Sequence, residues 1–200
     1  MSFGKIFGRR CAFARIACTT IACVALILGF TLASPAFADQ TDARLGTLFD
    51  QLLVVDNGAE ALKIERAIWN IWFEIDGDDI NSLLERGRNA LSSNQLAFAE
   101  KLYDELIEVA PDFAEGWNRR ATVRYMRGNI SGSITDIEVT LKLEPRHFGA
   151  ISGLGLCRIA LEDFNAAATA FRDVLAINPH AAGPMNNLKA IEQMLKNDSI

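Results

Sequence analysis

Two histidines and a cysteine are the side chains of residues 39–200 whose types best suit catalysis or metal binding. His147 and His180 follow prolines in stretches that look like loops, and neither has a Cys or carboxylate at the spacing of a metal site. Three of the four cysteines precede residue 39, and the remaining one, Cys157, has no histidine partner in a catalytic motif. We therefore expect surface histidines and a cysteine that packs in a helix, with no catalytic residue, metal site or cofactor.

Two short motifs suggest ligand-binding loops but lack the necessary context. Gly153-Leu154-Gly155 falls within a helical stretch, whereas phosphate-binding loops follow a strand. The run Asp76-Gly77-Asp78-Asp79 lacks the downstream glutamate of a calcium-binding loop, and Asp79 is better placed to cap a helix. Both motifs argue against an enzyme and favour a binding or structural protein.

The segment 1–38 has the pattern of a bacterial export signal. Four basic residues accompany an apolar run over 16–33, and Ser34-Pro35-Ala36-Phe37-Ala38 has the small residues of a cleavage site. Cleavage after Ala38 would leave a chain spanning 39–200 with a formal charge of (20 − 4) − 25 = −9, which argues against nucleic-acid binding. The alternative is an uncleaved membrane anchor, since the apolar run approaches the length of a spanning helix.

Prolines at 111, 145 and 179 recur with a constant period of 34 and indicate an internal repeat. Bulky residues stand 28 before each proline, small residues 24 and 12 before, and large residues 8 before. In that order the four sets are Leu83, Trp117 and Ile151; Gly87, Ala121 and Gly155; Ala99, Ser133 and Ala167; and Tyr103, Ile137 and Phe171.

This pattern is typical of paired helices. Two helices approach closely where both carry small side chains, and large ones fill the space around the crossing. Turn-forming sequences separate the two helices of each pair, and each proline ends the second one. The turn sequences are Ser92-Ser93-Asn94, Arg127-Gly128-Asn129 and Glu162-Asp163. Asp112 and Glu115 have the spacing of a capping box, and the predicted units are 80–113, 114–147 and 148–181.

The repeat resembles the tetratricopeptide repeat family, whose pattern is W-x2-L-G-x2-Y, A-x3-F, P. The middle unit matches with Trp117, Ala121, Ser133, Ile137 and Pro145, and the third with Ile151, Leu154-Gly155, Ala167, Phe171 and Pro179. The resemblance covers residues 80–181. It implies an all-α fold, a right-handed α-solenoid of antiparallel helix hairpins, whose first helices line a concave groove that holds partner peptides or proteins.

The flanking segments differ from full repeats. Residues 182–200 carry Lys189 where a repeat needs a small residue, so we predict a C-terminal capping helix with Met185, Leu188, Ile191 and Leu195 on one face. Residues 39–79 look like a degenerate hairpin of helices 44–55 and 59–73. In the repeat register Phe49, Leu52, Trp69 and Trp72 fit, but Leu53 and Glu65 stand at small positions. Trp69, Trp72 and Phe73 are either covered by the repeats or exposed as an interface.

Arginines replace apolar family residues at positions 86, 120, 124 and 158. One interpretation is a basic ladder that binds anions. The other pairs Arg120 with Asp136, which stands at i+16 on the facing helix, because a partly buried arginine needs a partner. We favour this structural ion pair.

The family's usual concave positions predict the lining of the groove. The second residues of the units, Asn81, Glu115 and Gly149, belong to it. The residues expected to contact a partner are Arg88, Leu91, Asn118, Arg119, Thr122, Tyr125, Met126, Ser152, Leu156 and Ile159. The lining is mostly apolar and departs from modules that clamp a C-terminal carboxylate, because their Lys, Asn and Arg set is not assembled. We predict an apolar or amphipathic partner segment, anchored by Tyr125 and contacting Arg88 through an acid. In the alternative, Leu91, Leu156 and Ile159 pack on neighbouring helices.

These features predict a noncatalytic protein–protein interaction adaptor or scaffold of the cell envelope, in the periplasm of a Gram-negative bacterium. Its partner would be a protein or peptide, not a nucleic acid or a small-molecule substrate. The alternative is a structural subunit that docks through its convex or N-terminal surface onto a larger envelope assembly.

Overall fold

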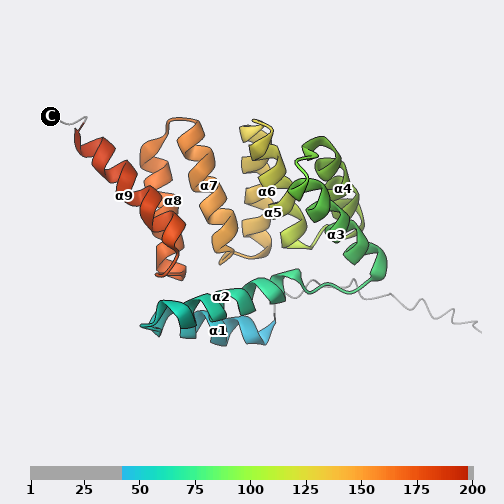
Figure 1. Ribbon diagram of the computed structural model, residues 1–200, viewed down its shortest axis with the longest axis horizontal. Coiled ribbons are helices and arrows are strands. Elements are labelled where there is room, and N and C mark those ends of the chain that lie inside the picture. Colours follow the sequence, from blue (N-terminus) through green and yellow to red (C-terminus); the bar gives the residue numbers. More distant parts are fainter. Residues whose placement is uncertain (1–41, 198–200) are drawn as a thin grey trace, which may run out of the picture. The chain divides into compact units, whose positions relative to one another are not determined.

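The computed structural model describes residues 42–197, which form nine α-helices and no β-strand (Figure 1). The predicted signal segment and its cleavage site lie outside these residues. The helices are α1 (Ala43–Val54), α2 (Gly58–Phe73), α3 (Asp78–Ser92), α4 (Leu96–Val109), α5 (Ala114–Met126), α6 (Ile130–Leu143), α7 (Phe148–Ala160), α8 (Phe164–Ile177) and α9 (Ala182–Asn197). No helix in this part of the chain is long and apolar enough to cross a membrane.

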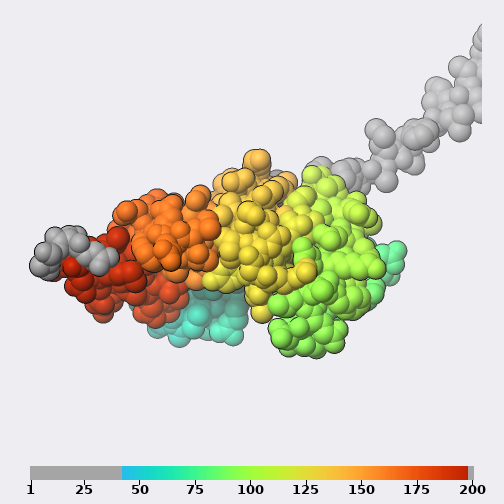
Figure 2. All heavy atoms as spheres, turned by 90° about the horizontal axis from the view of Figure 1, so that it is seen from above, coloured from blue at the N-terminus to red at the C-terminus, as the bar shows by residue number. Residues whose placement is uncertain are grey.

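Helices α3 to α8 form three antiparallel hairpins, α3–α4, α5–α6 and α7–α8, one in each predicted unit. The space-filling view shows them following one another in chain order, from green to orange (Figure 2). Because α4 packs on α5 and α6 on α7, each hairpin contacts the next. The predicted all-α solenoid of helix hairpins is confirmed.

The turns within the three hairpins repeat as closely as the helices. Asn94, Gly128 and Glu162, which recur at the period of the prolines, all have left-handed backbones, with φ of 58°, 78° and 59°. A residue in this region lets the chain leave one helix and enter the next within a short turn. The turn sequences identified above lie at these reversals.

The small residues of the pattern let large side chains cross between the paired helices. A methyl group on Gly87 would come within 2.5 Å of Tyr103 Cε1, and one on Gly155 within 2.6 Å of Phe171 Cε1. In the middle hairpin the Ser133 hydroxyl donates to the Ala121 carbonyl over 2.8 Å. Each crossing therefore needs its small residue for space.

Helix α9 covers the last repeat. Ile191 is buried against Ala167, Ala168 and Phe171, and Leu188 and Leu195 pack beside it. The predicted cap is thus a helix that continues to Asn197 and covers the apolar surface of α8.

Helices α1 and α2 form a hairpin that does not continue the stack. Its apolar side chains, Phe49, Ile68 and Trp72 among them, share one core with Phe148 of α7 and Val174 of α8. Figure 1 shows the hairpin running along the ends of the repeat helices.

The predicted helices 44–55 and 59–73 of this hairpin are present as α1 and α2, but the hairpin packs across α7 and α8 instead of adding a further repeat to the stack. Leu53, which the register places at a small crossing position, has 50% of its surface exposed. Glu65, the other misfit, accepts a hydrogen bond from Asn178. The hairpin packs on α7 and α8 through a core of aromatic and aliphatic side chains.

Candidate functional site

The groove between α5 and α7 is open over its central part. A hollow of about 70 Å³ lies there, floored by α6. Its lining residues are Asn118, Ala121, Thr122, Tyr125, Ser133, Ile137, Gly149, Gly153 and Leu156. Four of the ten predicted groove residues, Asn118, Thr122, Tyr125 and Leu156, therefore come together. Small and polar groups border the three larger side chains, Tyr125, Ile137 and Leu156, so the hollow suits a small apolar group with a polar edge.

Four other predicted groove residues lie elsewhere. Leu91 and Ile159 pack on neighbouring helices, and Leu156, which also lines the hollow, packs against the core of α8 and α9, as the alternative interpretation held for all three. Met126 is 49% exposed and does not line the hollow. Ser152 borders a second hollow, of about 290 Å³, with Leu62, Trp69 and His180.

The remaining two predicted residues, Arg88 and Arg119, hold an aromatic ring of the chain itself. Their guanidinium carbons lie 5.4 and 4.8 Å from the centre of the Phe73 ring, at the C-terminal end of α2. Such cation–π contacts are worth about 0.5–2 kcal/mol each. Arg119 also lies 5.8 Å from the Trp69 ring. One end of the predicted groove is therefore occupied by α2.

Trp69 reaches α7 at Gly149, the second residue of the third unit. A methyl group on Gly149 would come within 2.5 Å of Trp69 Cη2, so the indole fits only because position 149 has no side chain. Trp72 is 3% exposed, and Trp69 and Phe73 are half-buried. Of the two alternatives for these aromatics, the structure shows them covered by the repeats.

A buried Glu115–His147 pair lies beneath α2. His147 Nδ1 accepts from the Ala150 amide over 3.1 Å, so Nε2 carries the proton and donates to Glu115 Oε2 over 3.0 Å. The imidazole stacks on Trp72, whose indole N–H donates to Glu144. His147 is fully buried, so the expectation of a surface histidine is wrong: the ring caps α7 and α2 covers it.

Glu115 departs from its predicted role as well. The N-cap of α5 is Phe113, one residue after Asp112. The Glu115 carboxylate instead accepts from Asn118, Arg119 and His147. Burial acts to raise the pKa of Glu115, but the Arg119 charge and the His147 and Asn118 hydrogen bonds outweigh it and lower the pKa.

Two smaller expectations also need correction. His180 is half-buried, and its Nε2 lies 2.7 Å from the Val55 carbonyl, so it ties the α8–α9 connection to the N-terminal hairpin. Asp79 does not cap α3, because the N-cap is Gly77 and makes no side-chain bond. Asp79 lies in the first turn, where a negative charge still favours the helix dipole.

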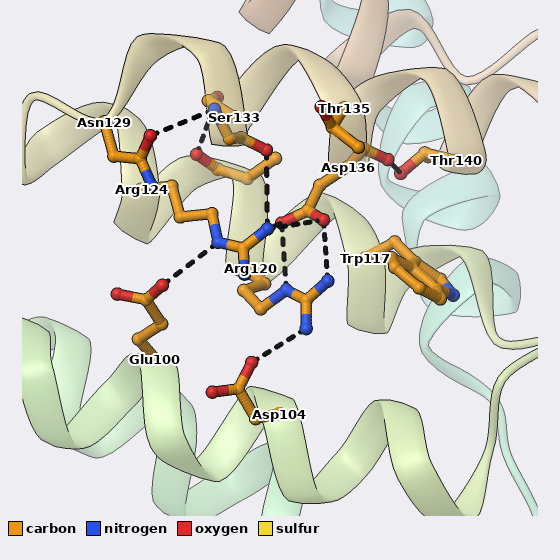
Figure 3. A network of polar contacts seen from close by, with 12 residues as sticks. Glu100, Asp104, Trp117, Arg120, Arg124, Asn129, Ser133, Thr135, Asp136 and Thr140 are labelled. Atoms are coloured by element: carbon orange, nitrogen blue, oxygen red, sulfur yellow. Dashed lines mark hydrogen bonds and ion pairs between the residues drawn. The ribbon is translucent and has the colours of Figure 1, made fainter.

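Charged side chains join α5 and α6 of the second hairpin to α4 of the first hairpin (Figure 3). Arg120 donates to both oxygens of Asp136, over 2.9 and 2.7 Å, as the i, i+16 spacing predicts. Arg124, which the sequence analysis did not assign to this ion pair, donates to the same carboxylate over 2.9 Å. The network continues to α4 through Asp104 and Glu100. Asp136 is completely buried, so its charge is balanced only by these arginines.

The network decides between the two interpretations of the arginine positions. Among these four positions of the described chain, only Arg86, which is exposed, forms no ion pair. Arg120 and Arg124 have carboxylate partners within the protein, and Arg158 lies 3.8 Å from Asp163. They form ion pairs instead of an open basic ladder. Within residues 42–197 no group of three His, Cys, Asp or Glu side chains is placed to hold a metal ion, and Cys157 is buried against Ser133.

Comparison with known proteins agrees with this architecture. A TPR repeat-containing protein of Rhizobium etli is 40% identical over 111 residues, 56% of this chain and 54% of that protein. The match thus spans about half of that relative. Tetratricopeptide repeat protein 36 of Homo sapiens is 28% identical over 153 residues, 68% of this chain and 80% of that protein. No model of a protein family matches the sequence.

Solved structures show the same fold at low sequence identity. The first TPR domain of Spaghetti (RPAP3), bound to the HSP90 peptide SRMEEVD, has a TM-score of 0.58 and 21% identity, over 60% of this chain and 96% of that one. The TPR2B domain of yeast Sti1, in a complex with pHsp70, has a TM-score of 0.55 and 17% identity, over 59% and 99%. The fold is that of a tetratricopeptide-repeat solenoid, and the names of the relatives support this family.

Proposed function

We propose that this protein is a noncatalytic adaptor of the bacterial cell envelope that holds a segment of a partner polypeptide in the groove between α5 and α7. The observation that carries the proposal is the hollow of about 70 Å³ beside Tyr125 and Leu156. A partly exposed aromatic ring beside an aliphatic side chain suits an apolar anchor of a partner, and the polar groups of Asn118 and Thr122 can accept or donate at its edge.

Two further observations support a peptide as the ligand. Neighbouring folds are TPR domains in complexes with peptides, the HSP90 peptide in one and the HSP70 peptide SGPTIEEVD in another. The arginines of the charged network, Arg120 and Arg124, are paired with Asp136 inside the protein, so a partner in the hollow would meet mostly uncharged groups. The envelope location rests on the export pattern of residues 1–38.

Site-specific crosslinking in cells tests the proposal. A photo-crosslinking side chain at Tyr125 should form a discrete adduct with a partner polypeptide. The matched control is the same side chain at Phe98, which is 46% exposed on α4 and lines a different surface. Equal adducts from both positions, or none from position 125, would reject groove binding.

A second candidate function, docking onto a larger envelope assembly, is favoured by one observation. Near the turn between α1 and α2, Leu53, Val54 and Leu62 are between 50% and 76% exposed. Replacing Val54 and Leu62 with glutamate should release the protein from such an assembly during size-exclusion chromatography of envelope extracts. An unchanged elution position would exclude this surface.

A further inference from the structure

Helix α2 presents three aromatic side chains, with i, i+3 and i+4 spacing, to the repeats. Trp69 lies against Gly149, Trp72 stacks on His147 with ring centroids 4.1 Å apart, and Phe73 lies under Arg88 and Arg119. Residues at this spacing share one face of a helix. The face of α2 that a partner would have to replace therefore carries this aromatic stripe together with the buried Ile64, Ile68 and Ile71.

The surface that receives this stripe belongs to the predicted groove. Arg88 lies on α3, Arg119 on α5 and Gly149 on α7, and all three were expected at concave positions. Guanidinium faces and a glycine gap recognise a flat ring by its shape and π-electrons, not by its place in the chain. Another helix with aromatic residues at the same spacing would make the same contacts.

The link between α2 and the repeats is short and turns at one residue. Residues 74–77 connect α2 to α3, and Gly77 has a φ of 114°, a conformation that glycine adopts without strain. Helix α2 packs on α1 and α5 and shares a core with α7 and α8, and its last residue, Phe73, also packs against the apolar core of the first hairpin. The hairpin is thus attached through its aromatic contacts, through the apolar core that it shares with α7 and α8, through hydrogen bonds such as that from Asn178 to Glu65, and through this connection.

We infer that this part of the groove is a binding surface for an amphipathic helix with aromatic residues at i, i+3 and i+4, and that α2 is its resident occupant. This inference builds on the proposed adaptor function, because it names the class of partner segment. A partner helix of this kind displaces α2, swings it about Gly77 and extends along the groove to the hollow at Tyr125.

A synthetic peptide tests whether α2 is an exchangeable ligand. The probe is a fluorescent copy of residues 58–76, and the control peptide has alanine at positions 69, 72 and 73. We expect the probe to bind the Trp69→Ala/Phe73→Ala chain at least tenfold more tightly than the parent chain, because the variant's own α2 makes fewer contacts with the repeats and competes less strongly. The control peptide should bind neither chain.

Three results would overturn the inference. They are equal binding of the probe to parent and variant, equal binding of probe and control peptide, and dimerisation of the variant by exchange of hairpins. The last result, seen by light scattering, would make a second copy the occupant. If position 125 crosslinks a partner but the peptide does not bind as expected, the adaptor function stands and the exchange of α2 is rejected. If the peptide binds as expected but position 125 forms no crosslink, only the adaptor function is rejected.

A glycine pair gives a second measurement that leaves the hairpin residues intact. Gly149→Ala places a methyl group 2.5 Å from Trp69 Cη2, whereas Gly153→Ala, on the same helix, meets Ile137 Cδ1 at an ordinary 3.4 Å. Amide exchange in α2 should become at least tenfold faster in Gly149→Ala and stay unchanged in Gly153→Ala, with α5 and α6 unaffected in both. Faster exchange throughout the repeats in Gly149→Ala would show that the hairpin does not undock separately.

Discussion

The imidazole ring of His147 lies flat on the indole ring of Trp72, with ring centroids 4.1 Å apart and 9° between the ring planes. The contact joins α2 to the start of α7, where the same imidazole accepts the capping bond from Ala150. On its other edge the ring donates to Glu115 of α5. One side chain therefore holds two successive repeats and the N-terminal hairpin together.

His147→Ala should lower the free energy of unfolding by about 2–4 kcal/mol. The substitution removes a helix cap, an aromatic contact and one donor to a buried carboxylate, and each loss costs about 1 kcal/mol or more. Urea unfolding followed by circular dichroism measures the loss. His180→Ala is the matched control, since it also follows a repeat proline but removes one hydrogen bond, to Val55, and should cost about 1 kcal/mol. Equal losses of unfolding free energy in the two variants would mean that the contacts of His147 with Trp72 and Glu115 do not stabilise the fold.

The stability contributed by Glu115 should depend on pH. Its pKa is lowered in the folded protein, so its contribution is complete above the unfolded value of about 4.5 and is lost as the pH falls through the folded value. Glu115→Gln should therefore be less stable than the parent at pH 7, and the difference should shrink below about pH 4.5. Glu108→Gln, at an exposed acid of α4, is the control and should change stability little at any pH. A difference that stays constant from pH 7 to pH 3 would contradict the role of the carboxylate charge.

The repeats were predictable from the sequence because their contacts recur at fixed short spacings. Gly87 and Tyr103 meet at an i, i+16 spacing, as do Arg120 and Asp136. Residues at this spacing lie on the two facing helices of one hairpin, and the pattern repeats from unit to unit. The left-handed turns at 94, 128 and 162 follow the same period.

The docking of the N-terminal hairpin could not be predicted in this way. Trp72 and Glu144 are 72 residues apart, and Asn178 and Glu65 are 113 apart, with no period that relates them. The environment of His147 depends on that docking, so its burial had no local signal. Glu115 gave one local clue to the burial of His147. It is the second residue of α5, and the last residue of the same repeat unit, His147 at i+32, lies against it.

Asp136→Ala should be the most damaging single change in the charged network, with a loss of about 3–5 kcal/mol, because it leaves two partly buried arginines facing a site without a carboxylate. Replacing the three charges together, as Arg120→Met/Arg124→Met/Asp136→Leu, should recover much of that loss, since apolar side chains of similar size need no partner. The triple variant is needed because Arg124 shares Asp136 with Arg120. Chemical denaturation of both variants measures the difference, and an equal or larger loss in the triple variant would show that the ion pairs stabilise the fold beyond their desolvation.

The thiols of the protein report whether residues 1–38 remain on the chain. Cys157 is fully buried, and burial raises the pKa of its thiol, so the native protein should react with a maleimide at Cys157 only on unfolding. After removal of residues 1–38, protein purified from the periplasm should show one reactive thiol in denaturant, because three of the four cysteines lie in that segment. Ser133→Ala is a control for reactivity, since it removes the hydrogen-bond partner of Cys157 without exposing the sulfur. Four thiols in denaturant, with the protein in the membrane fraction, would reject cleavage after Ala38 and favour an anchored form.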